Sequence, residues 1–258
     1  MKKSVIIVIA LLLHLPSFGW GQKGHDVVAY IAECNLQPEV YQKVVDRLGG
    51  HSLVYYANWL DNASYSDRYR YTKTWHYANV DEGYTYDTMP KNEKGDVVTA
   101  INGIVAELKS GKLSAEQEGI RLRMLIHLVG DIHCPMHAGR LSDRGGNGVI
   151  VKFFGKDTKL HSLWDTALVE SAHKWSYTEW EQQINRYCTP KRKAEIAKGE
   201  PKDWLKESHA LATEIYKATP EKGKVSYDYI AYYAPVIEQR LLAGGLRLAM
   251  ILNEIYGK

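Results

Sequence analysis

The 258-residue sequence has few of the residues that cross-link a chain or mark a domain boundary. Its three cysteines, Cys34, Cys134 and Cys188, allow at most one internal disulfide, so the fold cannot depend on a disulfide framework. It has only eight prolines, no linker rich in proline and serine, and no repeat of fixed period. We therefore expect one domain over residues 20–258, stabilised by something other than disulfides.

Excess charge of either sign is also nearly absent. The sequence has 33 basic and 30 acidic residues, and without Lys2 and Lys3 the balance is 31 basic against 30 acidic. A protein that holds nucleic acid over a broad surface normally carries a clear basic excess. If this chain acts on phosphates, it must attract them at a local site.

The first nineteen residues have the layout of a secretory signal peptide. A basic start is followed by an apolar run over residues 5–15, and small residues precede a cleavage site after Gly19. The alternative is an uncleaved N-terminal anchor, although the run is short for a membrane span. We expect cleavage and export, to the periplasm or the medium, with no remaining membrane segment and a mature chain that begins at Trp20.

Helical patterning dominates the rest of the chain and predicts an all-α fold. Pro38 marks a helix start, and Ser114 with Gln117 forms a capping box at the start of a long helix. The expected helices cover residues 22–34, 39–48, 52–60, 96–108, 114–133, 161–172, 177–187, 191–198, 201–218 and 227–255. Two stretches differ: residues 62–95 predict a long ordered loop, and residues 149–154 are β-prone and indicate a short hairpin.

Histidine and aspartate recur at a spacing that suits a metal site. His127 and Asp131 are four residues apart, as are His161 and Asp165, and this spacing places both side chains on one face of a helix. His137 follows shortly after the first pair. Each pair alone is also compatible with a hydrogen-bonded surface pair, but together they favour a metal. Imidazole and carboxylate ligands suit Zn²⁺.

Five sequence elements carry a resemblance to a known family. They are Trp20-Gly21-x-x-Gly24-His25, Trp59-x-Asp61, Trp75-His76, His127-x₃-Asp131-x₅-His137 and His161-Ser162-x-Trp164-Asp165. In this order they resemble the zinc-dependent single-strand-specific nuclease and 3′-nucleotidase family of fungi and plants, of the mung bean nuclease type. Zinc-dependent bacterial phospholipase C is a more distant relative. The resemblance extends from Trp20 to the last expected helix.

The resemblance implies three zinc ions. One would be held by Asp61, His76, His127 and Asp131; the second by His25, Asp131 and the free amine and carbonyl of Trp20; the third by His137, His161 and Asp165. Asp61 and Asp131 would then be catalytic, because they hold the metals that activate the attacking water. The ions also concentrate positive charge locally, which the balanced sequence otherwise lacks.

The resemblance further implies a nucleotide-binding surface. Tyr77 follows the loop histidine where family members stack a base, Asn79 replaces a common aspartate, and Asn147 belongs to a glycine-rich turn. Ser64 stands where many relatives have an arginine, so we expect Arg68 or Lys73 to steady the phosphate. Residues 55–86 contain eight tyrosines, and most of them are expected to pack loops rather than to stack bases.

Two other functions remain open from the sequence. A phospholipase C would need an apolar rim for acyl chains, whereas these loops offer tyrosine, asparagine and aspartate. A zinc-storing or structural metalloprotein would leave no open coordination position. We expect Cys134 not to be a ligand, because the zinc ions already have full ligand sets. Single-stranded DNA or RNA and 3′-nucleotides are the expected partners, with a monomeric protein.

Overall fold

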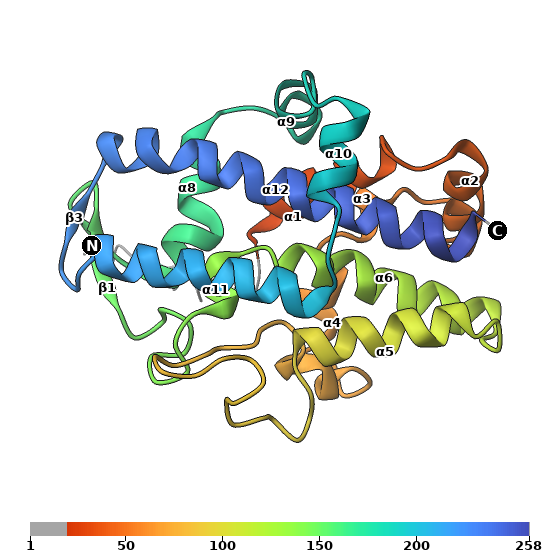
Figure 1. The fold of residues 1–258 in the computed structure, drawn as a ribbon, viewed down its shortest axis with the longest axis horizontal. Helices are drawn as coiled ribbons and strands as arrows, with labels where there is room; N and C mark the ends of the chain where they lie inside the picture. The colour runs from red at the N-terminus through yellow and green to blue at the C-terminus, as the bar shows by residue number, and fades with distance from the viewer. Residues whose placement is uncertain (1–19, 258) are drawn as a thin grey trace, which may run out of the picture.

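Helices make up most of the structure, a computed structural model that describes residues 20–257 (Figure 1). The longer ones are α1 (Gln22–Glu33), α2 (Pro38–Arg47), α5 (Val97–Lys109), α6 (Ala115–Asp131), α11 (Pro201–Ala218) and α12 (Tyr227–Tyr256). Shorter elements are α3 (Leu53–Tyr56), α4 (Trp59–Ala63), η1 (Arg70–Thr74), η2 (Pro135–Ala138), α7 (Leu160–Ser162), η3 (Leu163–Ala167), α8 (Leu168–Ala172), α9 (Tyr177–Ile184) and α10 (Pro190–Ile196). The all-α class is confirmed. The predicted signal peptide, residues 1–19, lies outside the described residues.

Local sequence signals set most helix ends. The Ser114 side chain accepts from the Gln117 amide, and the Gln117 side chain accepts from the Ser114 amide, so the predicted capping box begins α6. α6 ends at Asp131, two residues earlier than expected, because the chain turns there towards Pro135. The expected helix over 52–60 is two short helices, and the one over 161–172 contains a π-helical turn, η3.

The β structure is small and lies at one end of the molecule (Figure 1). The expected hairpin is present as β1 (Ile150–Phe153) paired antiparallel with β2 (Lys156–Lys159). A third strand, β3 (Lys224–Val225), pairs parallel with β1 and was not expected. Two residues are too few to show the alternation that reveals a strand.

Two apolar clusters form the interior, and α1 and α12 take part in both. Ala29 of α1 packs in the cluster that includes α5 and α6, while Val28 packs in the cluster that includes α8 and α9. α12 likewise contributes Leu252 to the first cluster and Ile237 to the second. The two helices therefore join the halves of the interior. No helix within residues 20–257 is both long and apolar enough to cross a bilayer.

Candidate metal centre

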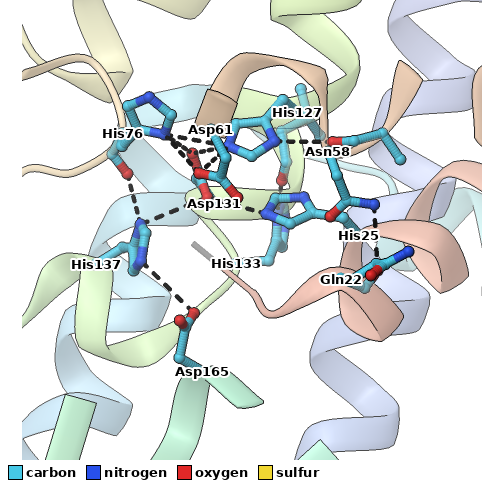
Figure 2. Close-up of polar contacts among 12 residues, drawn as sticks. Gln22, His25, Asn58, Asp61, His76, His127, Asp131, His133, His137 and Asp165 are labelled. Carbon is cyan, nitrogen blue, oxygen red and sulfur yellow. Dashed lines mark hydrogen bonds and ion pairs between the residues drawn. The ribbon is translucent and has the colours of Figure 1, made fainter. Parts of the chain in front are cut away.

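Seven of the eight side chains predicted as metal ligands converge in Figure 2, and the ring of the eighth, His161, stacks on that of His137. The eight come from seven segments of the chain. They are His25 of α1, Asp61 of α4, His76 just after η1, His127 and Asp131 of α6, His137 of η2, His161 of α7 and Asp165 of η3. All are buried except Asp61, whose side chain is 24% exposed. The geometry depends on close helix packing: a Cβ on Gly130 would lie 2.6 Å from His25 Nδ1.

Four donor atoms surround one point beside the last turn of α6. His76 Nδ1 lies 2.9 Å and His127 Nε2 lies 3.2 Å from Asp131 Oδ2, and the two nitrogens are 3.1 Å apart. Asp61 Oδ1 lies 3.3 Å from His127 Nε2 and 3.9 Å from His76 Nδ1. Donors bound to one tetrahedral zinc at 2.0–2.1 Å stand about 3.3 Å apart. The observed spacings fit that arrangement.

Backbone carbonyls orient three of the histidine rings. The Nδ1–H groups of His127, His137 and His161 donate to the carbonyls of Ala57, His76 and Gly145, at 2.8, 2.6 and 2.7 Å. A carbonyl can only accept, so Nδ1 carries the proton and Nε2 keeps its lone pair. This is the usual way in which a metal-binding histidine is held in one tautomer.

The two carboxylate oxygens of Asp131 face different groups. Oδ2 contacts His76 and His127, whereas Oδ1 lies 3.4 Å from His25 Nε2 and 3.6 Å from His137 Nδ1. One carboxylate thus lies between two sets of donors. Trp20 is fully buried nearby, and the Gly21 amide donates to the Asp165 carbonyl at 2.6 Å.

A third set of donors lies around Asp165. His137 Nε2 is 4.0 Å from Asp165 Oδ1, and the His161 ring stacks on that of His137 with centroids 5.3 Å apart. The Cys134 sulfur belongs to the same neighbourhood, since donor atoms of Cys134, His137 and Asp165 all lie within 4.8 Å of one another. Cys134 is therefore closer to this set than the sequence indicated.

Several of these buried atoms have no hydrogen-bond partner among the described residues. They are both ring nitrogens of His25, Nε2 of His137 and His161, and Oδ1 of Asp61 and Asp131. Leaving a buried polar atom unsatisfied costs about 1–3 kcal/mol, so such a concentration at one place needs an explanation. Cations bound to this mixed imidazole and carboxylate set would satisfy these atoms, and the donor types suit zinc.

The protein groups alone already favour most of the required protonation states. Burial lowers the pKa of His25 and His137, and it lowers the pKa of His161 to about 3, with His137 as a further cause. Burial acts to raise the pKa of Asp131, but His127 and His137 hold it well below its usual range. Burial acts to lower the pKa of His127, but the carboxylates of Asp131 and Asp61 outweigh burial and raise this pKa well above its usual value. A metal must therefore displace a proton from His127.

A cavity of about 380 Å³ opens beside His161. Three of the predicted substrate-binding residues, Tyr77, Asn79 and Asn147, line it. Burial raises the pKa of the Tyr77 hydroxyl, so this half-buried ring keeps its proton and presents a neutral aromatic wall. An uncharged aromatic and two amides can stack and hydrogen-bond a nucleobase.

Neither of the two cations predicted to steady a phosphate lines this cavity. Arg68 faces Glu116 at the start of α6, at 3.5 Å, roughly 16 Å along the helix from His127. Lys73 lies over the Tyr65 ring, 4.4 Å from its centroid. The sequence reasoning missed Arg144 and Lys159, which do line the cavity. The sequence did offer a signal for each: Arg144 directly precedes the glycine-rich turn, and Lys159 lies two residues before His161.

Comparison with known proteins agrees with this geometry. The family model described as S1/P1 Nuclease matches residues 20–257. The chain is 30% identical to Endonuclease 2 of Arabidopsis thaliana, covering 98% of this chain and 96% of that protein. It is 29% identical to Nuclease P1 of Penicillium citrinum, over 92% and 98% of the two chains. Nuclease S1 of Aspergillus oryzae is 32% identical over 65% of this chain and 60% of its own. Since the family model matches all of the described residues, 20–257, the protein belongs to the S1/P1 nuclease family.

Proposed function

We propose that the protein is a zinc-dependent nuclease with three metal ions. Its substrates are the phosphodiester bonds of single-stranded DNA and RNA and the phosphate monoesters of 3′-nucleotides. Membership of the S1/P1 nuclease family supports a nuclease, and so do the names of the similar proteins, Nuclease S1, Nuclease P1 and Endonuclease 2. The export signal over residues 1–19 remains part of the proposal.

The observation that carries the proposal is the position of Asp131. Its two oxygens face His76 and His127 on one side and His25 on the other. One carboxylate can therefore bridge two ions, and Asp61 completes the first set of donors. The remaining set, His137, His161 and Asp165, supports a third ion. Zinc bound here supplies a water of lowered pKa and positive charge for the phosphate.

The chain's own residues then have distinct tasks. His127, His137 and His161, whose Nδ1–H groups are held by backbone carbonyls, keep the Nε2 lone pair free and would hold the metals through Nε2. Asp61 is the ligand most exposed to solvent, so water and phosphate approach from its side. Tyr77 stacks the base, while Asn79 and Asn147 hydrogen-bond its edge. Since all the histidines of the centre are ligands, none serves as a general base.

A side-by-side assay tests the proposal. Protein starting at Trp20 is loaded with zinc and given single-stranded DNA, double-stranded DNA, 3′-AMP and phosphatidylcholine, and its metal content is measured. We expect hydrolysis of single-stranded DNA and 3′-AMP with about three zinc ions per chain, in line with the three sets of donors. Hydrolysis of phosphatidylcholine alone would identify a phospholipase C instead.

A metal-storage protein would give a different result. It would bind zinc but hydrolyse none of these substrates, and nucleotide would not perturb the metal sites. Replacement of zinc by cobalt makes that visible, because added 3′-nucleotide changes the visible spectrum only where a ligand position is open. An unchanged cobalt spectrum together with absent hydrolysis would contradict the proposed function.

A further inference from the structure

Two cations line the cavity beside His161, and neither has a partner. Within residues 20–257, the side chains of Arg144 and Lys159 make no ion pair and no hydrogen bond, and both residues are exposed. Lys152 of the neighbouring strand β1, by contrast, is paired, because its ammonium contacts Asp157 at 2.6 Å. Arg144 and Lys159 line the same cavity as Tyr77 and Asn79.

The backbone holds Arg144 at this position in an unfavourable conformation. Its φ of 59° is in the left-handed region, which residues other than glycine and asparagine rarely adopt. Gly145 and Gly146 follow with φ of 64° and 81°, and Asn147 Nδ2 donates to the Arg144 carbonyl at 2.9 Å. A residue held in this way costs of order 1 kcal/mol, and such residues cluster at ligand sites. Glycine would adopt this φ without strain, so the presence of arginine at this position indicates a role for its side chain.

The cavity and the metal centre share one wall. His161 lines the cavity, and its unpartnered Nε2 belongs to the metal-facing set. A nucleoside that reacts at its 3′ oxygen therefore places its base in the cavity and its 3′ phosphorus beside the metals. The 5′ oxygen of a nucleoside bound in this way would face away from the metal-facing set, on the side where Arg144 and Lys159 line the cavity.

This inference rests on the proposed function and deepens it. We propose that Arg144 and Lys159 bind the phosphate on the 5′ side of the nucleoside held in the cavity. The chain then favours nucleotides phosphorylated on both sides, as in the interior of a strand or in a nucleoside 3′,5′-bisphosphate, over 3′-monophosphates. An exposed cation contributes modestly to such a contact, so each should change KM by about threefold to tenfold.

Steady-state kinetics on two substrates that differ by one phosphate test the proposal. The KM of the zinc enzyme is measured for 3′-AMP and for adenosine 3′,5′-bisphosphate, following release of the 3′ phosphate. The variants are Arg144→Asn and Lys159→Gln, separately and together. Asparagine removes the charge and tolerates the left-handed backbone, so the turn is preserved. Lys156→Gln is the matched control, because Lys156 is exposed on the same strand as Lys159 but does not line the cavity.

The ratio of the two KM values gives the answer. Wild type and Lys156→Gln should favour the bisphosphate by about tenfold or more, and the double variant should bring the ratio close to one. Added salt should weaken the preference in wild type, because exposed charges are screened. A wild-type ratio near one, or a ratio unchanged in the double variant, would overturn the inference.

Failure of the proposed function gives a separate pattern. If neither nucleotide is hydrolysed, the proposed function fails, and the equilibrium binding of the same two nucleotides still tests the cavity by calorimetry. Tighter binding of the bisphosphate that depends on Arg144 and Lys159 would support the phosphate site even then. Equal binding of both nucleotides would reject it.

Discussion

Two largely buried polar clusters lie next to each other in this protein, with Glu207 of one reaching the surface, and they differ in how their polar atoms are satisfied. The metal-facing cluster contains His25, Asp61, His76, His127, Asp131, His137, His161 and Asp165. The arginine network contains His133, Glu207, Ser208, Arg240 and Arg247. One short segment, residues 127–137, supplies members to both.

The polar side chains of the arginine network are hydrogen-bonded to one another and to backbone carbonyls. Glu207 accepts two hydrogen bonds from Arg247, both at 2.7 Å, and one from Arg240 at 2.9 Å. His133 donates from Nδ1 to the Val129 carbonyl at 2.7 Å and accepts at Nε2 from Arg247 at 2.9 Å. Ser208 donates to the Ile132 carbonyl at 2.6 Å. None of its side-chain atoms is buried without a partner.

His133 and His137 show how a structural polar cluster can be told from a ligand site. His133 and His137 are both buried, and both donate from Nδ1 to a backbone carbonyl. They differ at Nε2, since that of His133 accepts from an arginine and that of His137 has no hydrogen-bond partner. The candidate metal centre is therefore distinguished by its neighbouring polar atoms without hydrogen-bond partners, and not by buried charge alone.

Removal of metal should have the largest effect, because the metal-facing cluster depends on metal and the arginine network does not. We expect a chelator to abolish hydrolysis and to lower Tm by on the order of 10 °C. A ligand at a thousand times its Kd adds about 4 kcal/mol, and each kcal/mol shifts a protein of this size by about 2–4 °C. Scanning calorimetry with metal analysis measures this. An unchanged Tm after verified metal removal would show that the metal-facing cluster, like the arginine network, is stable without metal.

Substitutions of Asp131 and Asp165 test which of these aspartates holds two metal ions and which holds one. Asp131→Asn should lose two of the three metals and nearly all turnover, because each Asp131 oxygen faces a different set of donors. Asp165→Asn, its matched control, should lose only one metal. Metal content and kcat are measured together. Equal metal loss in the two variants would contradict the bridging role of Asp131.

The sequence predicted the members of the metal-facing cluster better than the residues around it. Spacing of four residues on a helix determines the direction of His127 and Asp131 directly, and the resemblance supplied their partners. Arg68 and Lys73 were predicted from their position in the chain, but loops of residues 62–95 set their direction, and local pattern does not encode it. The arginine network was also invisible, because Glu207 and Arg247 are forty residues apart.

An N-terminal extension tests whether cleavage after Gly19 also activates the enzyme. If the Trp20 amine is a ligand, an added Ala or Met before Trp20 converts it to an amide that binds metal poorly. We expect such an extension to cut kcat at least tenfold and to remove one metal, while the ion near Asp165 stays bound. Protein starting at Trp20 is the control. Full activity in the extended protein would mean that cleavage serves export only.

Opening the arginine network should cost stability but not metal. Burial raises the pKa of Glu207, but hydrogen bonds from Arg247 and Arg240 outweigh it and hold the pKa below 4.5. Because the Glu207 side chain is 43% exposed, Glu207→Gln should cost only about 1–2 kcal/mol at neutral pH, or about 4 °C in Tm.

The sign of the pH dependence follows from that lowered pKa. The contribution of Glu207 is complete above about pH 4.5 and is lost as pH falls through the lower pKa of the folded protein. Tm curves of wild type and Glu207→Gln should therefore converge in acid. Zinc content should be the same in both proteins at pH 7. Loss of zinc in the variant would show that the two clusters are coupled.

The smallest expected effect concerns Cys134, which lies at the border of the two clusters. Its sulfur is near the donors of His137 and Asp165, and it directly follows His133 of the arginine network. Burial, with Asp165 as a further cause, raises the pKa of its thiol well above the usual value, so the protein groups alone keep it protonated. His137, His161 and Asp165 already provide three donors for an ion at this place. We therefore expect the cobalt-substituted enzyme to lack an intense thiolate-to-cobalt band in the near ultraviolet, and Cys134→Ser to leave both the spectrum and the metal content unchanged. Such a band in wild type, lost in Cys134→Ser, would move Cys134 into the metal-facing cluster and make the third site sensitive to oxidation.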